Sequence, residues 1–178
     1  MERNMKVLIT YYSGTGNTKK IASAIKEGLP GHEVDLFPVK EVNPTELGNY
    51  DLLFLGSGTY GFNVSRKIIT LIKKATSLPG NFAYFSTHES QKSWPDAFKS
   101  VNDMLKDHNC KILGEFDCSG ENLVEKAQEQ REAMYSRMKP EEKVEAEKIY
   151  QNFVKGRPNA DDLNNVKNFA KEIIQKLS

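Results

Sequence analysis

The sequence predicts an α/β fold, an open doubly wound sheet of five parallel strands with helices on both faces. Short apolar runs rich in β-forming residues alternate with segments whose apolar residues recur at helical spacing. The run LLFL at 52–55 is typical of a strand that is covered on both faces. With 178 residues, the chain is expected to form one domain, 1–178, without the support of disulfides or metals.

The first half of the chain contains three of the expected strands. In order, the pattern predicts a strand over 6–12, a helix with Ile21, Ala22, Ile25 and Leu29 on one face, a strand over 33–37, a connecting segment over 38–49 and a strand over 51–56. Pro30 and Gly31 end the helix. Glycine-rich segments directly follow the first and third strands, which makes both of them candidates for a binding loop.

The second half continues the alternation. The expected elements are a helix with Ile68, Ile69, Leu71, Ile72 and Ala75, a strand over 81–86, a helix with Trp94, Phe98, Val101 and Leu105, a strand over 109–118, and a last helix with Val166, Phe169, Ala170, Ile173, Ile174 and Leu177. Asn159 is suited to begin the last helix, because its side chain can accept hydrogen bonds from the first-turn N–H groups.

The segment 121–158 interrupts this alternation. It mixes acidic and basic side chains with few apolar residues at sparse helical spacing, which predicts an amphipathic helical insertion before the last helix. Two helices are expected, parted near Lys139 and Pro140, because proline suits a first helical turn. We interpret the insertion as a solvated helical face. The alternatives are a partner-docking surface, a cover over a ligand site and a dimer surface.

Charge and composition exclude several classes of partner. The formal net charge of +1 provides no overall field that would attract nucleic acid or an anionic membrane. No apolar run approaches the roughly 18 residues of a membrane span. The first residues lack the features of a signal peptide, so we expect a cytoplasmic protein. Cys110 and Cys118 lie about 26 Å apart if one strand contains both, too far for a disulfide, and no residues show metal-site spacing.

The segment Ser13–Thr18, SGTGNT, connects the first strand to the first helix. A loop that enters a helix at the carboxyl end of a parallel strand is suited to an anion, because helix N-termini present unpaired N–H groups and a positive dipole end. The spacing of Gly14 and Gly16 fits neither the NTPase loop nor the dinucleotide fingerprint. The hydroxyl-rich turn fits a terminal monophosphate instead. The plain alternative is a strand-to-helix turn with a polar cap.

This loop resembles the flavodoxin family's phosphate loop, [ST]-x-T-G-x-T, at every fixed position. The whole chain looks like a flavodoxin-fold protein, which implies the strand order 2-1-3-4-5 and an FMN cofactor at the switch point of the sheet. The resemblance places the FMN phosphate on six consecutive residues, Ser13, Gly14, Thr15, Gly16, Asn17 and Thr18.

Two further loops would border the flavin ring if the resemblance holds. The second, around Gly58, Thr59, Tyr60 and Gly61, is similar to the family's Thr-Trp-Gly loop. Tyr60 would stack on the flavin, and the Gly61 peptide would turn its carbonyl toward the flavin N5 when that nitrogen gains a proton. The alternative is that the aromatic residues of this loop are hydrophobic lids.

The third loop follows the strand over 81–86 and contains Thr87, His88 and Trp94. It departs from the family pattern, because glycine is expected there and none occurs. Trp94 fits equally well as a core residue of its helix. His88 is interpreted as an ordinary loop histidine, with proton handling as the alternative.

The resemblance implies an FMN-binding electron carrier that serves redox partner proteins. The first alternative is an NAD(P)H-dependent flavin or quinone reductase, which would need a nicotinamide cofactor and an acceptor beside the ring. The second alternative is a cofactor-free binding module. Flavodoxins are typically acidic, whereas this chain is nearly neutral, which leaves its choice of partner open.

Overall fold

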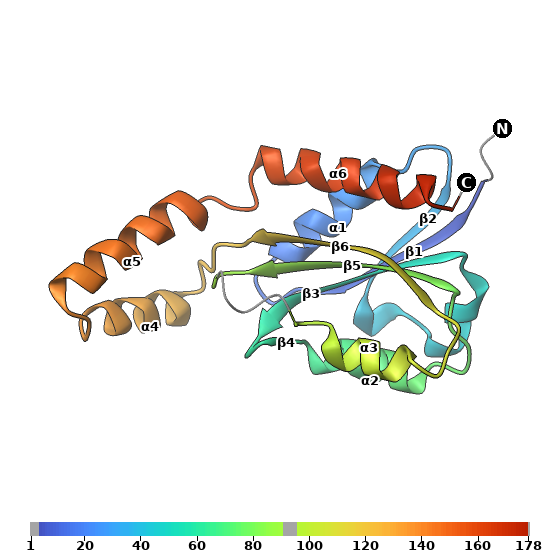
Figure 1. The fold of residues 1–178 in the computed structure, drawn as a ribbon, viewed down its shortest axis with the longest axis horizontal. Coiled ribbons are helices and arrows are strands. Elements are labelled where there is room, and N and C mark those ends of the chain that lie inside the picture. Colours follow the sequence, from blue (N-terminus) through green and yellow to red (C-terminus); the bar gives the residue numbers. More distant parts are fainter. Residues whose placement is uncertain (1–3, 91–95, 178) are drawn as a thin grey trace.

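A computed structural model describes residues 4–90 and 96–177 (Figure 1). Its strands are β1 (Lys6–Tyr12), β2 (Glu33–Pro38), β3 (Leu52–Tyr60), β4 (Asn63–Val64), β5 (Asn81–His88) and β6 (Lys111–Ser119). Five of them form a parallel sheet in the order β2-β1-β3-β5-β6, and the short β4 pairs antiparallel with β3. The expected five-stranded parallel sheet and its order are therefore confirmed, with β4 as an addition.

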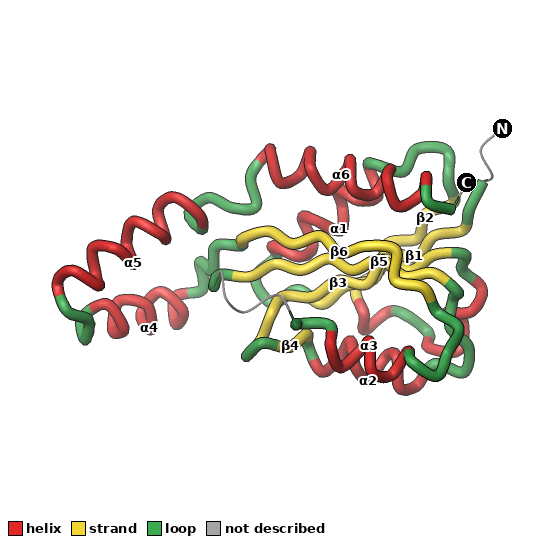
Figure 2. Tube along the Cα trace, viewed as in Figure 1, coloured by secondary structure: helices red, strands yellow, loops and turns green. Residues whose placement is uncertain are grey.

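Helices cover both faces of the sheet (Figure 2). They are α1 (Asn17–Glu27), α2 (Arg66–Lys74), α3 (Lys99–Leu105), α4 (Glu125–Tyr135), α5 (Pro140–Phe153) and α6 (Ala160–Gln175), with 3-10 turns η1 (Val39–Glu41) and η2 (Pro44–Asn49). α1 and α6 lie on one face, and α2 and α3 lie on the other. This is the doubly wound arrangement predicted from the sequence.

The core consists of one apolar layer on each side of the sheet. On the first side, Ile21 and Ile25 of α1 and Val166 of α6 pack with β1 residues and are fully buried. On the second side, Ile68 of α2 and Val101 of α3 pack on the opposite faces of the same strands. Since side chains alternate along a strand, a central strand must be apolar on both faces to separate two helical layers.

Several boundaries differ from the predicted ones. β3 continues through the polar residues up to Tyr60, beyond the predicted end of the strand at 56. The connecting segment over 38–49 contains two 3-10 turns. Helix α3 begins at Lys99, and Trp94, expected either beside the flavin or in the core, lies outside the described residues.

The insertion forms a helical hairpin that extends beyond the carboxyl ends of the strands (Figure 1). Pro140 is the first residue of α5, so the predicted break between the two helices is confirmed. Neither α4 nor α5 buries a residue, consistent with their mixed charges. After the hairpin, Asn159 caps α6 by accepting from the N–H groups of Asp161 and Asp162, as predicted.

Within the residues described, no helix has the length and apolar character that crossing a membrane requires.

Candidate functional site

Three loops meet at one edge of the sheet. They follow β1, β3 and β5, which are neighbouring parallel strands, so their carboxyl ends lie together. In open α/β sheets, the position where the strand order reverses is where ligands bind. Here that position lies between β1 and β3, because β2 follows β1 in sequence but lies on its other side. The loop at 13–18 leaves the sheet at this point.

The first loop is held open by backbone geometry at Gly16. Its φ of 90° lies in the left-handed region, where glycine is favoured, and α1 begins at the next residue. The Ser13 Oγ accepts hydrogen bonds from the N–H groups of Gly16 at 3.1 Å and Lys19 at 3.3 Å. The hydroxyl hydrogen of Ser13 remains available to donate, as does the exposed hydroxyl of Thr15.

Asn17 and Thr18 join the first loop to other segments of the protein. Both side chains are buried. The Asn17 Nδ2 donates to the Glu121 carbonyl oxygen at 2.8 Å, and the Thr18 Oγ1 lies 2.9 Å from the Thr87 Oγ1. From the sequence, both residues are expected to contact the phosphate, because they lie in the loop that resembles the family's phosphate loop. The structure shows them bonded to other loops, so their side chains fix the position of the loop and its N–H groups.

Tyr60 connects the second loop to the first. Its Oη accepts a hydrogen bond from the Gly14 N–H at 3.3 Å, and its ring lies edge-on to Tyr12 with 5.7 Å between centroids. Partial burial raises the pKa of Tyr60, and the Gly14 hydrogen bond acts in the opposite direction. The side chain is still 45% exposed. An aromatic face is therefore available at the edge of the candidate site.

The second loop is a tight hairpin between β3 and β4. Gly61 and Phe62 have φ values of 56° and 67°, and Tyr60 pairs with Asn63 across them. Two central residues with positive φ are typical of a type I′ turn, which matches the twist of a β-hairpin. The Asn63 Nδ2 donates to the Gly61 carbonyl oxygen at 3.1 Å, which fixes the carbonyl that was expected to face a flavin. Gly58 and Thr59 lie in β3, before the turn.

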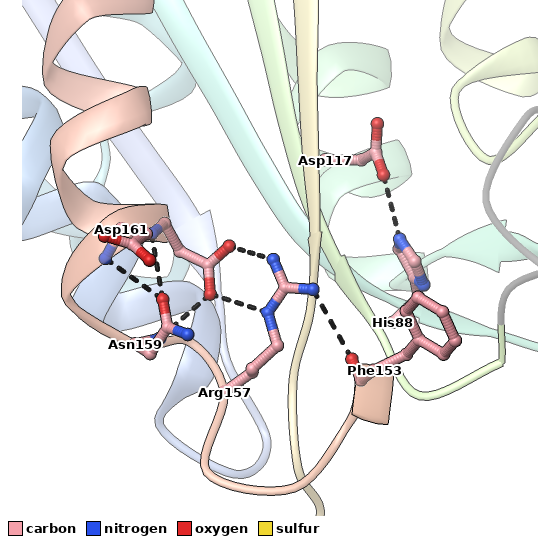
Figure 3. A network of polar contacts seen from close by, with 7 residues as sticks. His88, Asp117, Phe153, Arg157, Asn159 and Asp161 are labelled. Atoms are coloured by element: carbon pink, nitrogen blue, oxygen red, sulfur yellow. Dashed lines mark hydrogen bonds and ion pairs between the residues drawn. The ribbon is translucent and has the colours of Figure 1, made fainter. Parts of the chain in front are cut away.

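Two residues that the sequence placed in the third loop, Thr87 and His88, are the buried last residues of β5. Thr87 contacts Thr18 of the first loop. The His88 Nε2 lies 3.0 Å from the Asp117 Oδ2, and the His88 carbonyl accepts from the Gly120 N–H at 2.9 Å. His88 is 4% exposed, so it is a buried residue with a carboxylate neighbour and not an exposed loop residue. Figure 3 shows the His88–Asp117 contact.

Residues of the hairpin also contact the candidate site, and the sequence did not predict them. Glu121 accepts hydrogen bonds from the Tyr150 hydroxyl and from the Gly156 N–H, the latter at 2.8 Å. These two hydrogen bonds hold the pKa of Glu121 below its ordinary value, and the one from Tyr150 has the larger effect. Because Asn17 donates to the Glu121 carbonyl, the same residue joins the first loop to the hairpin.

Arg131 makes a second connection, between α4 and the third loop. Its guanidinium pairs with the Glu89 carboxylate and lies 4.2 Å from the centroid of the Tyr150 ring. At the base of the hairpin, the Arg157 Nε donates to the Asp162 Oδ2 at 2.8 Å (Figure 3). No local sequence signal predicts these contacts. Arg131 and Glu89 are distant in sequence, and Arg157 lies in an irregular turn before α6.

The donors of the first loop suit a phosphate monoester. The loop over 13–18 contains no acidic residue, and the first turn of α1 contains none either. The first N–H groups of a helix have no acceptor within the helix, and they lie at the positive end of its dipole. Together with the Ser13 and Thr15 hydroxyls, they form a neutral donor set that favours a bound dianion. Within the described residues, no group of metal-ligating side chains is present.

Comparison with known proteins shows the family that the first loop resembles. A flavodoxin domain model matches residues 8–171. An uncharacterized protein of Methanocaldococcus jannaschii is 30% identical over 172 residues, which cover 96% of this chain and 99% of that protein. A flavodoxin of Clostridium beijerinckii is 45% identical over 58 residues, or 32% of this chain and 42% of the relative.

Solved structures share the fold at low sequence identity. An archaeal flavodoxin superposes with a TM-score of 0.64 at 15% identity, covering 97% of this chain and 99% of its own. A Lactobacillus acidophilus flavoprotein in complex with FMN superposes with a TM-score of 0.53 at 20% identity, covering 64% of this chain and 93% of its own. Since the domain model spans most of the sequence, the chain belongs to the flavodoxin family.

Proposed function

We propose that this protein binds FMN and carries electrons between redox partner proteins. The observation that carries the proposal is the first loop, where Gly16, the N-terminus of α1 and the hydroxyls of Ser13 and Thr15 form a neutral donor set at the switch point of the sheet. The family membership and the FMN complex of the L. acidophilus flavoprotein support the choice of cofactor. When bound, FMN supplies one- and two-electron redox chemistry.

The protein's own residues have three roles in this proposal. Ser13, Thr15 and the first N–H groups of α1 bind the phosphate. Tyr60, whose hydroxyl accepts from the Gly14 N–H, would provide an aromatic face for the flavin ring. The Gly61 carbonyl, now bonded to Asn63, is the acceptor that can turn toward a protonated ring nitrogen. The remaining predicted contacts, Gly58, Thr59, Thr87, His88 and Trp94, stay predictions.

The test begins with the absorption spectrum of the purified protein and its titration with FMN. The proposal expects bound flavin or stoichiometric uptake, whereas a colourless protein that takes up no FMN contradicts it. Stepwise photoreduction then separates a carrier from a reductase. Two resolved one-electron steps support the carrier. A single two-electron step with rapid oxidation of NAD(P)H by a quinone supports the reductase instead.

A further inference from the structure

We infer that a cationic surface beside the first loop docks a redox partner with an acidic face. This cationic surface consists of Lys19, Lys40, Arg66, Lys67, Lys73 and Lys74, from α1, η1 and α2. All six side chains are exposed. The inference rests on the proposed function, because it identifies the chemistry of the partner that would exchange electrons at that site.

The charge of this surface is one-sided. Helix α2, RKIITLIKK, carries four basic residues and no acidic one. Glu41 is the acidic residue that lines the adjoining hollow, and it pairs with Lys40 at 3.8 Å while both side chains remain exposed. Exposed ion pairs of this kind contribute little. The whole chain has a net charge of only +1, so the excess of positive charge on this surface is balanced by negative charge elsewhere. The charge of the protein is therefore distributed asymmetrically.

Four of these basic residues, Lys19, Lys40, Lys67 and Lys74, line two adjoining hollows. A hollow of about 370 Å³ is bordered by Ser13 and Gly16 of the first loop and by Lys19, Lys40 and Lys67. A second, of about 340 Å³, shares Lys40 and Lys67 with the first and continues along α2. The cationic surface therefore begins at the candidate phosphate loop and extends away from it.

Exposed aromatic residues adjoin one end of the cationic surface. A third hollow, of about 540 Å³, shares Lys67 and Tyr12 with the first and reaches Tyr60. The Lys67 Nζ lies 5.0 Å from the centroid of the Tyr12 ring. Tyr60 is 45% exposed and Phe62 is 61% exposed. Aromatic residues at the centre with charged residues at the rim are typical of protein interfaces.

The extent of the surface favours a protein over a nucleotide. From Arg66 to Lys74, α2 advances about 12 Å, in addition to the part of the surface formed by α1 and η1. Redox encounters use small interfaces, and complementary charge mainly accelerates their association. The helical hairpin lacks this one-sided charge, because acidic and basic side chains are mixed along α4 and α5.

The first experiment measures binding of the full chain to an acidic two-iron ferredoxin, followed by amide chemical shifts at low and at high salt. Binding is expected to perturb amides of η1, α2 and the turn at Gly61–Phe62, and to weaken steeply with salt. Basic cytochrome c should not bind this surface. Tighter binding of cytochrome c, or perturbation confined to the hairpin, would overturn the inference. So would NADPH or a short RNA that binds this surface where ferredoxin does not.

The second experiment compares two charge-matched variants. Lys40→Glu combined with Lys74→Glu changes the cationic surface, and Lys143→Glu combined with Lys148→Glu makes the same charge change on α5. The first pair should weaken ferredoxin binding at low salt by about tenfold or more and the second by less than about twofold. Equal losses in both would overturn the inference.

FMN uptake, measured separately, distinguishes the two proposals. Uptake of FMN without ferredoxin binding removes the docking surface and leaves the proposed function. Ferredoxin binding at α2 without FMN uptake removes the proposed function and leaves the docking surface.

Discussion

The Oγ1 atoms of Thr18 and Thr87 lie 2.9 Å apart and join the start of α1 to the end of β5. Both side chains are buried, with exposures of 2% and 6%. Replacing either threonine by valine keeps the shape but leaves the other hydroxyl buried without this partner, which costs about 1 to 3 kcal/mol of stability. We expect the double variant to lose less than the sum of the two single losses.

Urea-induced unfolding of the wild type and the three variants measures this coupling. Losses that simply add would show that the two hydroxyls do not depend on one another.

The turn at Gly61 and Phe62 stores backbone strain. A non-glycine residue at positive φ costs about 1 to 2 kcal/mol, and Phe62 has a φ of 67° with its side chain exposed. Phe62→Asn should raise the free energy of unfolding by about 1 kcal/mol, because asparagine tolerates this conformation. Gly61→Val should lower the free energy of unfolding by about 1 to 2 kcal/mol, because valine does not tolerate this conformation. The loss would come from the backbone, since no atom lies within 4 Å of the added Cβ.

Thermal and urea unfolding test both substitutions at the turn. If the two variants change stability in the same direction, backbone strain is not the controlling factor there. For FMN-loaded protein, Gly61→Val should also reduce the separation of the two one-electron midpoint potentials, and an unchanged separation would contradict the role proposed for the Gly61 carbonyl.

Glu121 should make the stability of the protein depend on pH. Its pKa is lowered in the folded state, first by the Tyr150 hydroxyl and then by the Gly156 N–H. A carboxylate whose pKa is depressed by folding stabilises the fold above its ordinary pKa of about 4.3, and this contribution is lost as the pH falls through the lower folded value. The wild type should therefore lose more stability between pH 6 and pH 3 than Glu121→Gln.

Unfolding curves across this range provide the measurement for Glu121, and parallel pH profiles of the two proteins would be inconsistent with the mechanism. Tyr150→Phe is the matched control. It removes the larger of the two hydrogen bonds, so it should raise the Glu121 pKa in a carboxyl NMR titration. Burial, and next the hydrogen bond to Glu121, raise the pKa of Tyr150 to about 12.

Arg131 should hold the hairpin against the third loop. Its side chain is 16% exposed, and it combines the Glu89 ion pair with the contact to the Tyr150 ring at 4.2 Å. Arg131→Ala should weaken the attachment by about 1 kcal/mol, which corresponds to about fivefold faster exchange of α4 amides. Lys126→Ala, at an exposed position of the same helix, is the control. Equal exchange in both variants would mean that Arg131 does not anchor the hairpin.

Periodicity predicted the α/β class with helices on both faces of a parallel sheet, whereas the strand order was implied by the resemblance to the flavodoxin family. The run at 52–55 is buried on both faces, and the last helix packs through the apolar face that its spacing indicates. Strands that are apolar on both faces need helices on both sides of the sheet, and the alternation of strands and helices along the chain provides them. The type I′ turn was not predicted, because Gly61-Phe62 lacks the Asn-Gly or Asp-Gly pair typical of that turn.

The sequence predicted the features of the candidate site that depend on neighbouring residues. It did not predict the contacts that join segments distant in sequence. Gly16 lies in the left-handed region at the start of α1, a conformation that favours glycine. Asn17 and Thr18 looked like ligand donors, yet their partners lie far away in sequence, at Glu121 and Thr87. Polar residue types do not reveal whether their hydrogen bonds go to a ligand or to another segment.

The most direct test compares the affinities for FMN and riboflavin, which differ by the phosphate. Two charge-assisted hydrogen bonds of about 1.5 kcal/mol each correspond to roughly a hundredfold preference for FMN. Ser13→Ala, which removes a hydroxyl from the first loop, should weaken FMN binding about tenfold and leave riboflavin binding unchanged. A fluorescence titration that shows equal affinities for the two flavins, or no loss of FMN affinity in Ser13→Ala, would contradict the assignment of the loop over 13–18 to the phosphate.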